Sequence, residues 1–204
     1  MNKEKIILMA GFKFDTQKMD KLNDPERLKD IPPDFILEKL NMKNPGAVVD
    51  LGAGTGLFSI RFARMPGIEK VYALDIADVM VEYINENVSP LYPEIIPLSM
   101  EESNIPLQDN IAGFLVMINL HHELHEPLKL LEEAARVLKQ GGKLAIVDWK
   151  KKETGHGPPV EKRCDTGTIH QQLKETSYQS VKIYDELPNH FLIVAENGGT
   201  MGNL

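Results

Sequence analysis

One stretch near the start of the chain, residues 47–58, constrains the fold more than any other. It begins with an apolar, β-branched run over residues 47–49 that follows a Pro-Gly break, which is typical of a fully buried parallel strand. Glycine then occupies every other position from Gly52 to Gly56, and apolar residues at helical spacing resume at Leu57. The stretch therefore predicts a strand, a tight glycine turn and a helix.

The chemistry of this turn indicates a ligand that carries an ammonium group. Glycine allows positive φ angles and lets a ligand approach the backbone without a Cβ in the way. Asp50 ends the predicted strand, where open α/β sheets bind their ligands. The free N–H groups of the following helix favour an anion, but a carboxylate at Asp50 would repel a pyrophosphate and attract an ammonium. The alternative is a glycine-rich turn that binds nothing.

The spacing of the glycines separates this turn from two phosphate-binding motifs. Gly52, Gly54 and Gly56 form Gly-x-Gly-x-Gly, whereas dinucleotide folds use Gly-x-Gly-x-x-Gly and a P-loop needs Gly-Lys-Ser/Thr. Val-Val-Asp-Leu-Gly-Ala-Gly-Thr-Gly instead resembles motif I of the class I S-adenosylmethionine-dependent methyltransferases. The resemblance extends from about residue 14 to the final strand. It is closest to small-molecule methyltransferases of the ubiquinone/menaquinone C-methyltransferase-like type.

The order of the predicted elements indicates the fold class. Further strand-like runs occupy residues 70–75, 95–98, 111–118, 143–149, 180–185 and 191–195. Most of them alternate with helical patterns, and a short turn separates the last two. This order predicts an α/β fold with a doubly wound, mostly parallel sheet and a C-terminal antiparallel hairpin. The resemblance implies a Rossmann-like sheet of seven strands in the order 3-2-1-4-5-7-6.

The length of 204 residues favours a single methyltransferase domain, residues 1–204. We expect residues 1–40 to form a helical cap or lid, in which Phe12 and Phe14 close over the site. A helix over residues 128–139 should end at the C-capping pair Gly141-Gly142. Residues 197–204 are expected to form a disordered tail.

The resemblance implies S-adenosylmethionine as the cofactor and assigns residues to each of its parts. The ammonium faces Asp50, the carboxylate faces the glycine turn, and Asp75 accepts from the ribose hydroxyls. The adenine lies between Ile76 and Met100, and its amino group donates to Glu101, although Glu102 is the neighbour that could take this role. The predicted cofactor-binding set is Asp50, Gly52, Ala53, Gly54, Gly56, Asp75, Ile76, Met80, Met100, Glu101 and Asn119.

A cluster of histidines follows the fourth predicted strand. Where an acceptor must lose a proton, a histidine suits the role of base, and we select His122 first and His121 second. His121 and His125 have a spacing that a metal site could use, but the HExxH order is missing, so no metal is expected. Trp149, the Gly155–Pro159 loop and the Leu187–His190 turn should complete a pocket for a small-molecule methyl acceptor.

The composition excludes some partners. A net charge of −7 without a basic stripe argues against nucleic acid. The single cysteine fits a reducing cytoplasm, and no apolar run approaches bilayer length. We therefore expect a cytoplasmic enzyme with no stable membrane insertion; its oligomeric state stays open.

Two alternative functions are considered. One is a nicotinamide-dependent oxidoreductase, which would require Gly-x-Gly-x-x-Gly, and the other is a non-catalytic S-adenosylmethionine-binding protein.

Overall fold

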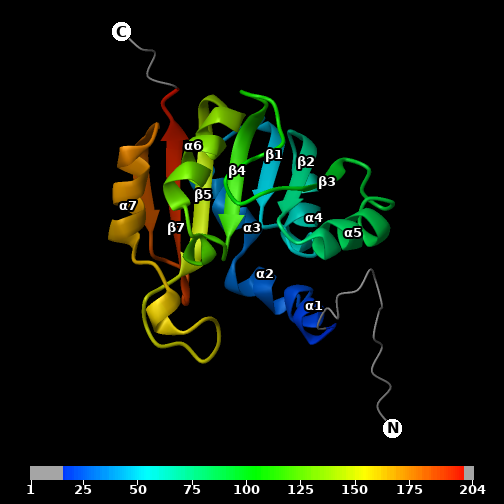
Figure 1. The fold of residues 1–204 in the computed structure, drawn as a ribbon, viewed down its shortest axis with the longest axis horizontal. Helices are drawn as coiled ribbons and strands as arrows, with labels where there is room; N and C mark the ends of the chain where they lie inside the picture. Colours follow the sequence, from blue (N-terminus) through cyan, green and yellow to red (C-terminus); the bar gives the residue numbers. More distant parts are fainter. Residues whose placement is uncertain (1–15, 200–204) are drawn as a thin grey trace.

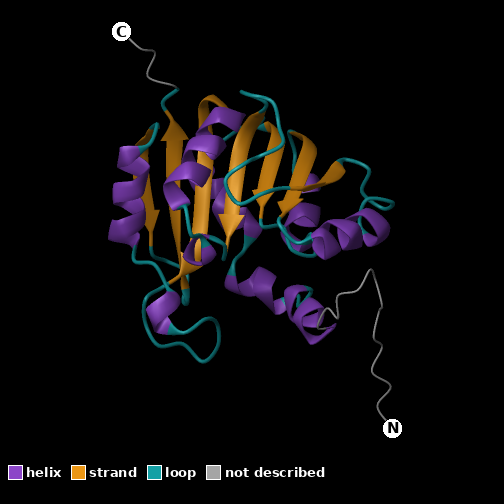
Figure 2. Cartoon of the chain, viewed as in Figure 1, coloured by secondary structure: helices purple, strands orange, loops and turns teal. Residues whose placement is uncertain are grey.

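The structure, a computed structural model, describes residues 16–199, which fold around one seven-stranded sheet (Figures 1 and 2). The strands are β1 Gly46–Leu51, β2 Ile68–Asp75, β3 Ile95–Ser99, β4 Ala112–Ile118, β5 Leu138–Trp149, β6 Tyr178–Tyr184 and β7 His190–Asn197. The α-helices are α1 Thr16–Leu22, α2 Glu26–Asp30, α3 Pro33–Leu40, α4 Leu57–Ala63, α5 Asp78–Asn87, α6 Pro127–Val137 and α7 Thr166–Glu175. Short 3-10 helices lie at His121–Glu123 and Val160–Lys162.

The strand order is β3-β2-β1-β4-β5-β7-β6, which confirms the predicted fold class and topology. β1 pairs in parallel with β2 on one side and with β4 on the other, so the chain reverses its direction of progress across the sheet between β3 and β4. β7 runs antiparallel to both β5 and β6. Ligands of doubly wound sheets bind at such a switch point, and here it lies at the end of β1.

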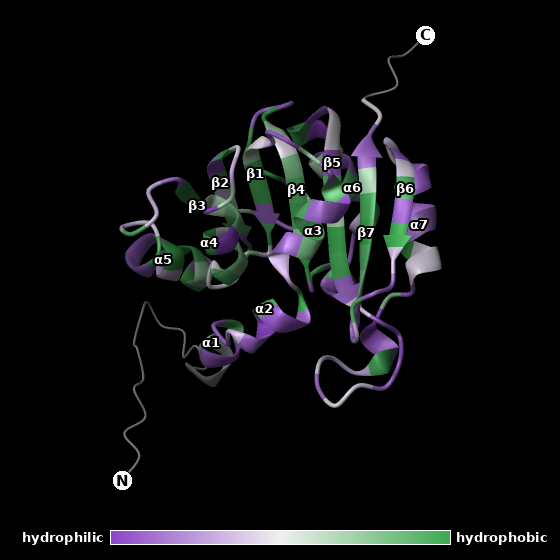
Figure 3. Cartoon of the chain, turned by 180° about the vertical axis from the view of Figure 1, so that it is seen from behind, coloured by the Kyte–Doolittle hydropathy of each residue, from purple (hydrophilic) through white to green (hydrophobic). Residues whose placement is uncertain are grey.

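Helices cover both faces of the sheet, and this explains the continuous apolar runs in its strands. Every residue of β4 is buried. On one face α6 and α7 contribute Leu131, Ile169 and Leu173 to a single core cluster. On the other face α4 packs against β1 and β2, α5 against β2 and β3, and α3 against β5 and β7, and these three helices lie on the side of the sheet that Figure 3 shows.

The parallel strands end at one edge of the sheet, and three other segments gather beyond it. Figure 1 shows α1, α2 and the loop of residues 150–163 at this carboxyl edge. The glycine turn also lies here, since it follows β1 directly. Among the residues that the structure describes, no helix is long and apolar enough to cross a membrane.

The end of α6 differs from the prediction. The helix ends at Val137 and the chain enters β5 at once, so Gly141-Gly142 lies in the strand and does not cap the helix. A Cβ on Gly142 would lie 2.7 Å from the carbonyl oxygen of Lys139, so a glycine is needed for this bend. Asn197 caps the helix end instead, because its buried amide donates to the carbonyl oxygens of Ala135 and Leu138.

This contact also corrects the predicted tail. Residue 197 is the last residue of β7, and the backbone N–H of Gly198 donates to the carbonyl oxygen of Ser177 at 2.9 Å. Residues 197 and 198 are therefore held in place by hydrogen bonds, which the prediction of a disordered tail did not foresee for them. Residues 200–204 of the predicted tail, and the two phenylalanines of the predicted lid, lie outside the described residues. The described part of residues 1–40 contains α1, α2 and α3, and a lid over the site stays a prediction.

Candidate active site

The glycine turn requires its glycines for conformation and for space. Gly52, Gly54 and Gly56 have φ angles of +69°, +57° and +80°, which strain any residue with a Cβ. A Cβ on Gly52 would also lie 3.0 Å from the side chain of Leu120. The segment after β4 therefore packs directly against the turn after β1, as a shared site requires.

Asp75, at the end of β2, holds this turn from the neighbouring strand. One of its carboxylate oxygens accepts from the backbone N–H of Gly54 at 2.8 Å, and the other accepts from that of Ala77 at 2.9 Å. The predicted ribose acceptor thus lies beside the glycine turn, and it also fixes the turn's shape. Each carboxylate oxygen can accept more than one hydrogen bond, so these contacts leave capacity for hydroxyl donors.

Asp50 lies beneath the turn and is 2% exposed. Burial raises the pKa of its carboxyl to about 7, against the opposing effect of the Ser59 hydroxyl, which donates to it at 2.6 Å. The nearby charge of Asp75 raises this pKa further. A buried carboxyl with this pKa gains stabilisation from any cation that binds beside it.

Two buried polar atoms at this edge test whether the residues fit the cofactor. Thr55 Oγ1 in the glycine turn and Asn119 Oδ1 after β4 have no hydrogen-bond partner in the described part of the chain. Asn119 also adopts a left-handed backbone with φ +56°. Unpaired buried acceptors are costly and cluster at functional sites. With Asp50 and Asp75 they form a set of acceptors that suits the ammonium and hydroxyl groups of S-adenosylmethionine.

The residues predicted to hold the adenine are only partly assembled. Ile76 is 65% exposed at the end of β2, and Met100 is half-buried. Met80 is buried on α5, and Glu101 is exposed and forms an isolated bridge with Asn104.

Glu102 has a different role from its neighbour. Its carboxylate accepts from the backbone N–H groups of Glu126 at 3.0 Å and of His125, and so it caps the start of α6. These hydrogen bonds hold the pKa of Glu102 below its usual value. Glu101 therefore stays the candidate for the adenine amino group.

His122 forms a buried pair with Asp148 at the ends of β4 and β5. The ring Nδ1 lies 2.7 Å from one Asp148 oxygen, and the backbone N–H of His122 donates to the other at 3.0 Å. Burial alone would lower the pKa of His122, but the hydrogen bond and charge of Asp148 outweigh it and raise the pKa above its usual value. Because Nδ1 contacts the carboxylate, Nε2 is the nitrogen that can exchange a proton.

The other two histidines of the cluster turn elsewhere. His121 is 2% exposed, its Nε2 lies 2.8 Å from Gln172 Oε1 on α7, and burial lowers its pKa. His125 contacts Glu102 and is exposed. Within residues 16–199, no three His, Cys, Asp or Glu side chains are grouped as metal ligands. His122 and His121, the second candidate base, therefore have different partners and opposite pKa shifts.

The loop of residues 150–163 is organised by two side chains, Arg163 and Trp149. The Arg163 guanidinium is buried and donates to the backbone carbonyl oxygens of Lys150, Lys152, His156 and Pro158 and to the Thr154 hydroxyl. It also lies 5.1 Å from the Trp149 ring centroid. A Cβ on Gly157 would lie 2.9 Å from the indole, so this glycine lets the loop close over Trp149.

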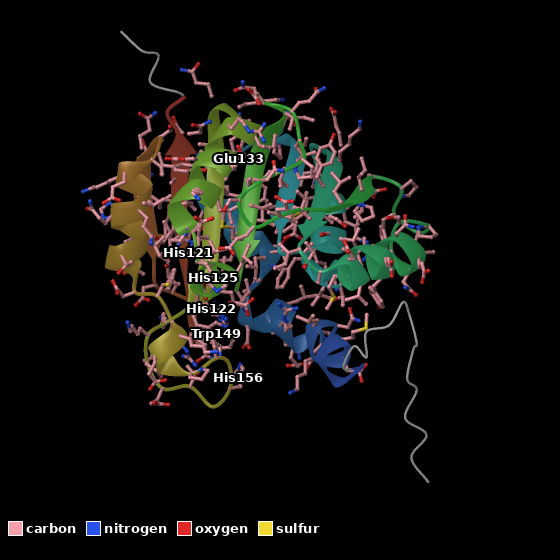
Figure 4. All side chains as sticks on the ribbon, viewed as in Figure 1. His121, His122, His125, Glu133, Trp149 and His156 are labelled. Carbon is pink, nitrogen blue, oxygen red and sulfur yellow. The ribbon has the colours of Figure 1, made fainter. Side chains whose placement is uncertain are left out.

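His190, the first residue of β7, completes this cluster. Its ring centroid lies 4.1 Å from that of Trp149, and it is 1% exposed. Burial lowers its pKa to about 4, so the ring is neutral near pH 7. Neither ring nitrogen has a partner among the described residues. Figure 4 shows His121, His122, Trp149 and His156 in succession from the end of the sheet into the loop.

Sequence reasoning missed Asp148 as the partner of His122, and Arg163 as the residue that holds the loop. Asp148 lies 26 residues from its partner, and no local motif marks it. The parallel pairing of β4 and β5 could have indicated the pair, since His122 closely follows β4 and Asp148 lies near the end of β5. For Arg163 the sequence carries no signal.

The strand order and the glycine turn, with carboxylates near the ends of β1 and β2, are the arrangement expected of a class I S-adenosylmethionine-dependent methyltransferase. Comparison with known proteins agrees. Residues 49–146 match the family described as methyltransferase domain. A crystal structure of an S-adenosylmethionine-dependent methyltransferase from Aquifex aeolicus is 36% identical, with a TM-score of 0.83 over 91% of this chain and 100% of that one. The chain therefore belongs to this enzyme family, whose cofactor is S-adenosylmethionine.

Curated relatives are more distant. An uncharacterized methyltransferase of Mycobacterium tuberculosis is 30% identical over 118 residues, which are 56% of this chain and 46% of that protein. The ubiquinone/menaquinone biosynthesis C-methyltransferase UbiE of Salmonella arizonae is 26% identical over 139 residues, 67% of this chain and 54% of that protein. The chain thus spans about half the length of these relatives. The comparisons favour a methyltransferase over a nicotinamide-dependent oxidoreductase and a non-catalytic binding protein.

Proposed function

We propose that this protein transfers a methyl group from S-adenosylmethionine to a small-molecule acceptor in the cytoplasm, with His122 as the base. The observation that carries the proposal is the His122–Asp148 pair, 2.7 Å apart at the carboxyl edge of the sheet. His122 lies on the segment after β4, and Leu120 of the same segment packs against the glycine turn. A base and a cofactor-binding turn on adjoining segments are what proton removal coupled to methyl transfer needs.

In this proposal one set of residues binds the cofactor and another removes the proton of the acceptor. Asp50, Asp75 and the glycine turn bind and orient the cofactor, which supplies a methyl group already activated on a sulfonium. Asp148 accepts a hydrogen bond from the Nδ1–H of His122 and fixes the ring, which leaves the lone pair of Nε2, 3.8 Å from Glu123 Oε1, to take the proton of the acceptor. Asp148 also stabilises the imidazolium that forms when His122 takes the proton.

The net charge of the chain and the residues around the loop of residues 150–163 support a small-molecule acceptor. A net charge of −7 disfavours nucleic acid. The buried Trp149–His190 pair combines an indole with a neutral imidazole whose two nitrogens have no partner among residues 16–199, and such a site suits an uncharged or weakly acidic small molecule. The curated relative of the ubiquinone/menaquinone type fits this class, although its likeness to this chain is limited.

Two measurements test the proposal. The first is calorimetric titration with S-adenosylmethionine, S-adenosylhomocysteine and NAD; we expect heat with the first two only. The second incubates the protein with methyl-labelled donor and a cell extract, and then separates small molecules, proteins and nucleic acids. We expect label in the small-molecule fraction. Label only in protein or nucleic acid would overturn the acceptor class, and donor binding without label in any fraction would favour a non-catalytic binding protein.

A further inference from the structure

Arg27, on α2, lies against the cofactor side of the site, although nothing in its sequence context marks it as a ligand-binding residue. Its guanidinium carbon lies 5.3 Å from the ring centroid of Phe58, which belongs to the first turn of the helix after the glycine turn. The guanidinium also donates to the carbonyl oxygen of Leu22 at 2.7 Å. The cation is therefore half-buried beside the turn.

The segment that carries Arg27 is fixed over the turn by other contacts. The side chain of Leu22, at the end of α1, lies 3.7 Å from the position that a Cβ on Gly54 would take. The next residue, Asn23, donates its side-chain amide to the Tyr83 hydroxyl on α5 at 3.1 Å. The position of Arg27 is thus a property of the fold and does not depend on the free rotation of a surface side chain.

Arg27 and Asp50 interact electrically without direct contact. Burial lowers the pKa of Arg27, and the negative charges of Asp50 and Asp24 oppose this effect. Arg27 in turn lowers the pKa of Asp50 against the effect of burial. No ion pair joins the two side chains in the described structure, so neither charge is neutralised by contact. A cation and a carboxyl group therefore border the same glycine turn.

We propose that Arg27 binds the α-carboxylate of S-adenosylmethionine while Asp50 binds its α-ammonium. The amino-acid end of the cofactor is a zwitterion, and a partly buried zwitterion needs an opposite charge for each of its groups. A guanidinium binds a carboxylate through two parallel hydrogen bonds, which makes arginine selective for this group. The proposal rests on the cofactor of the proposed function but not on its acceptor.

The competing explanation is structural. Arg27 already holds the Leu22 carbonyl oxygen and covers the Phe58 ring, and these contacts alone could account for its burial. A structural arginine would affect every ligand of the site equally, since it would act through the shape of the turn. An arginine that binds the carboxylate would affect only ligands that have one. Decarboxylated S-adenosylmethionine keeps the adenosine, sulfonium and ammonium groups and lacks only that carboxylate.

The experiment measures the affinities of both ligands by calorimetry for the native protein and for Arg27→Met, Arg27→Lys and Lys29→Met. Lys29, also on α2, is exposed and pairs only with Glu26 among the described residues, so it is the matched control. We expect Arg27→Met to lower the affinity for S-adenosylmethionine at least tenfold and the affinity for the decarboxylated ligand less than about threefold. Arg27→Lys should recover part of the loss, because it keeps the charge but not the two-point geometry. Lys29→Met should change neither affinity.

The outcomes separate this inference from the proposed function. Equal losses for both ligands, or no loss for either, would overturn the role of Arg27 and leave the methyltransferase assignment intact. Failure of the native protein to bind S-adenosylmethionine would overturn the proposed function itself. Circular dichroism and thermal unfolding check each variant, and the comparison of Arg27→Lys with the native protein carries the test if Arg27→Met does not fold.

Discussion

The turn after β1 and the loop after β5 lie at the same edge of the sheet, yet different contacts hold them in shape. The turn depends on its own backbone, with three glycines at positive φ and a hydrogen bond from Gly54 to Asp75. The loop depends on side-chain contacts made from its two ends, by Arg163 and by Trp149. The turn therefore combines the left-handed backbone of contiguous glycines with one carboxylate from the neighbouring strand, whereas the loop is held by side-chain contacts that span it and by the contact of Trp149 with His190 of β7.

This difference suggests how the two parts of the site can vary. The cofactor is a fixed molecule, so a backbone cradle that recognises it needs little change between related enzymes. The acceptor pocket is built from loops on a rigid sheet, which can be altered without disturbing the core. We therefore expect mutations in the turn to affect cofactor binding and mutations in the loop to affect turnover.

Gly54→Ala should have the largest effect and would break the turn. The left-handed backbone at φ +57° costs a residue with a Cβ about 1–2 kcal/mol, and the added methyl would lie 3.7 Å from the Leu22 side chain, within the turn that we expect to bind the cofactor. We expect the affinity for S-adenosylhomocysteine, measured by calorimetry, to fall about a hundredfold.

Gly141→Ala is the control for that variant. Gly141 has φ +73° and no neighbouring atom within 4 Å of its potential Cβ, so it carries the same backbone strain away from the site. It should lower the unfolding temperature by a similar amount and leave cofactor affinity unchanged. A similar loss of affinity in both variants would show that strain, and not ligand contact, explains the effect.

The contrast between turn and loop also explains what the sequence could predict. The strands and the glycine turn follow from local patterns, because buried parallel strands are apolar throughout and Asp50 lies two residues before the first glycine, whereas the strand order came from the family resemblance. The His122–Asp148 pair depends on which strand ends become neighbours, and the hydrogen bonds of Arg163 within its loop follow no local pattern. The expected glycine cap of α6 was wrong for the same reason, since Asn197 reaches the helix from β7.

His122→Asn should have the next largest effect, and it acts on the acceptor side. Removal of the base should lower the turnover number at least tenfold, about 1.4 kcal/mol of barrier, with cofactor affinity nearly unchanged. His125→Asn is the matched control, because His125 is exposed and contacts only Glu102 among the described residues. Steady-state kinetics with the acceptor from the extract screen measures both; equal turnover in the two variants would remove His122 from the mechanism.

The pH dependence of turnover gives a sharper form of this test. A base must be deprotonated to act, so the rate should rise with pH through the pKa of His122, which Asp148 raises above its usual value. Asp148→Asn removes the charge that opposes burial, so the acid limb of the profile should move to lower pH while the maximal rate falls. If the acid limb of the Asp148→Asn profile stays at the native pH, the group that titrates in the profile is not His122.

Asp50 offers a prediction of intermediate size on the cofactor side. Its pKa is about 7, and only the ionised carboxylate attracts the cofactor's ammonium, so affinity should fall up to about tenfold per pH unit below 7. Asp50→Asn should bind weakly and lose this slope, whereas the exposed control Asp34→Asn should keep it. Calorimetry between pH 5.5 and about pH 7.5 measures the slope; a flat profile in the native protein would contradict it.

The same carboxyl should oppose stability. Its pKa in the folded protein is raised above the ordinary value of 3.8, so the unfolded chain releases the proton first as pH rises. The free energy of unfolding should therefore fall between about pH 4 and pH 7 by up to about 1.4 kcal/mol per unit. Asp50→Asn should lack this decline. Urea unfolding of the protein without ligand at several pH values measures the difference between the two chains.

The smallest expected effect lies where the two parts of the site meet. His156 on the loop after β5 contacts Asp30 at the end of α2, with 3.3 Å between Nε2 and Oδ2. Their side chains are 58% and 38% exposed, so the pair should contribute less than about 1 kcal/mol to stability and should be screened by salt. Because it joins the loop to the helix that carries Arg27, Asp30→Asn should act on the Michaelis constant for the acceptor, by about twofold to threefold at low ionic strength. The difference should disappear at high salt, and Asp34→Asn on α3 should show none at any ionic strength. A change that persists in salt would mean that Asp30 supports the fold of α2 itself.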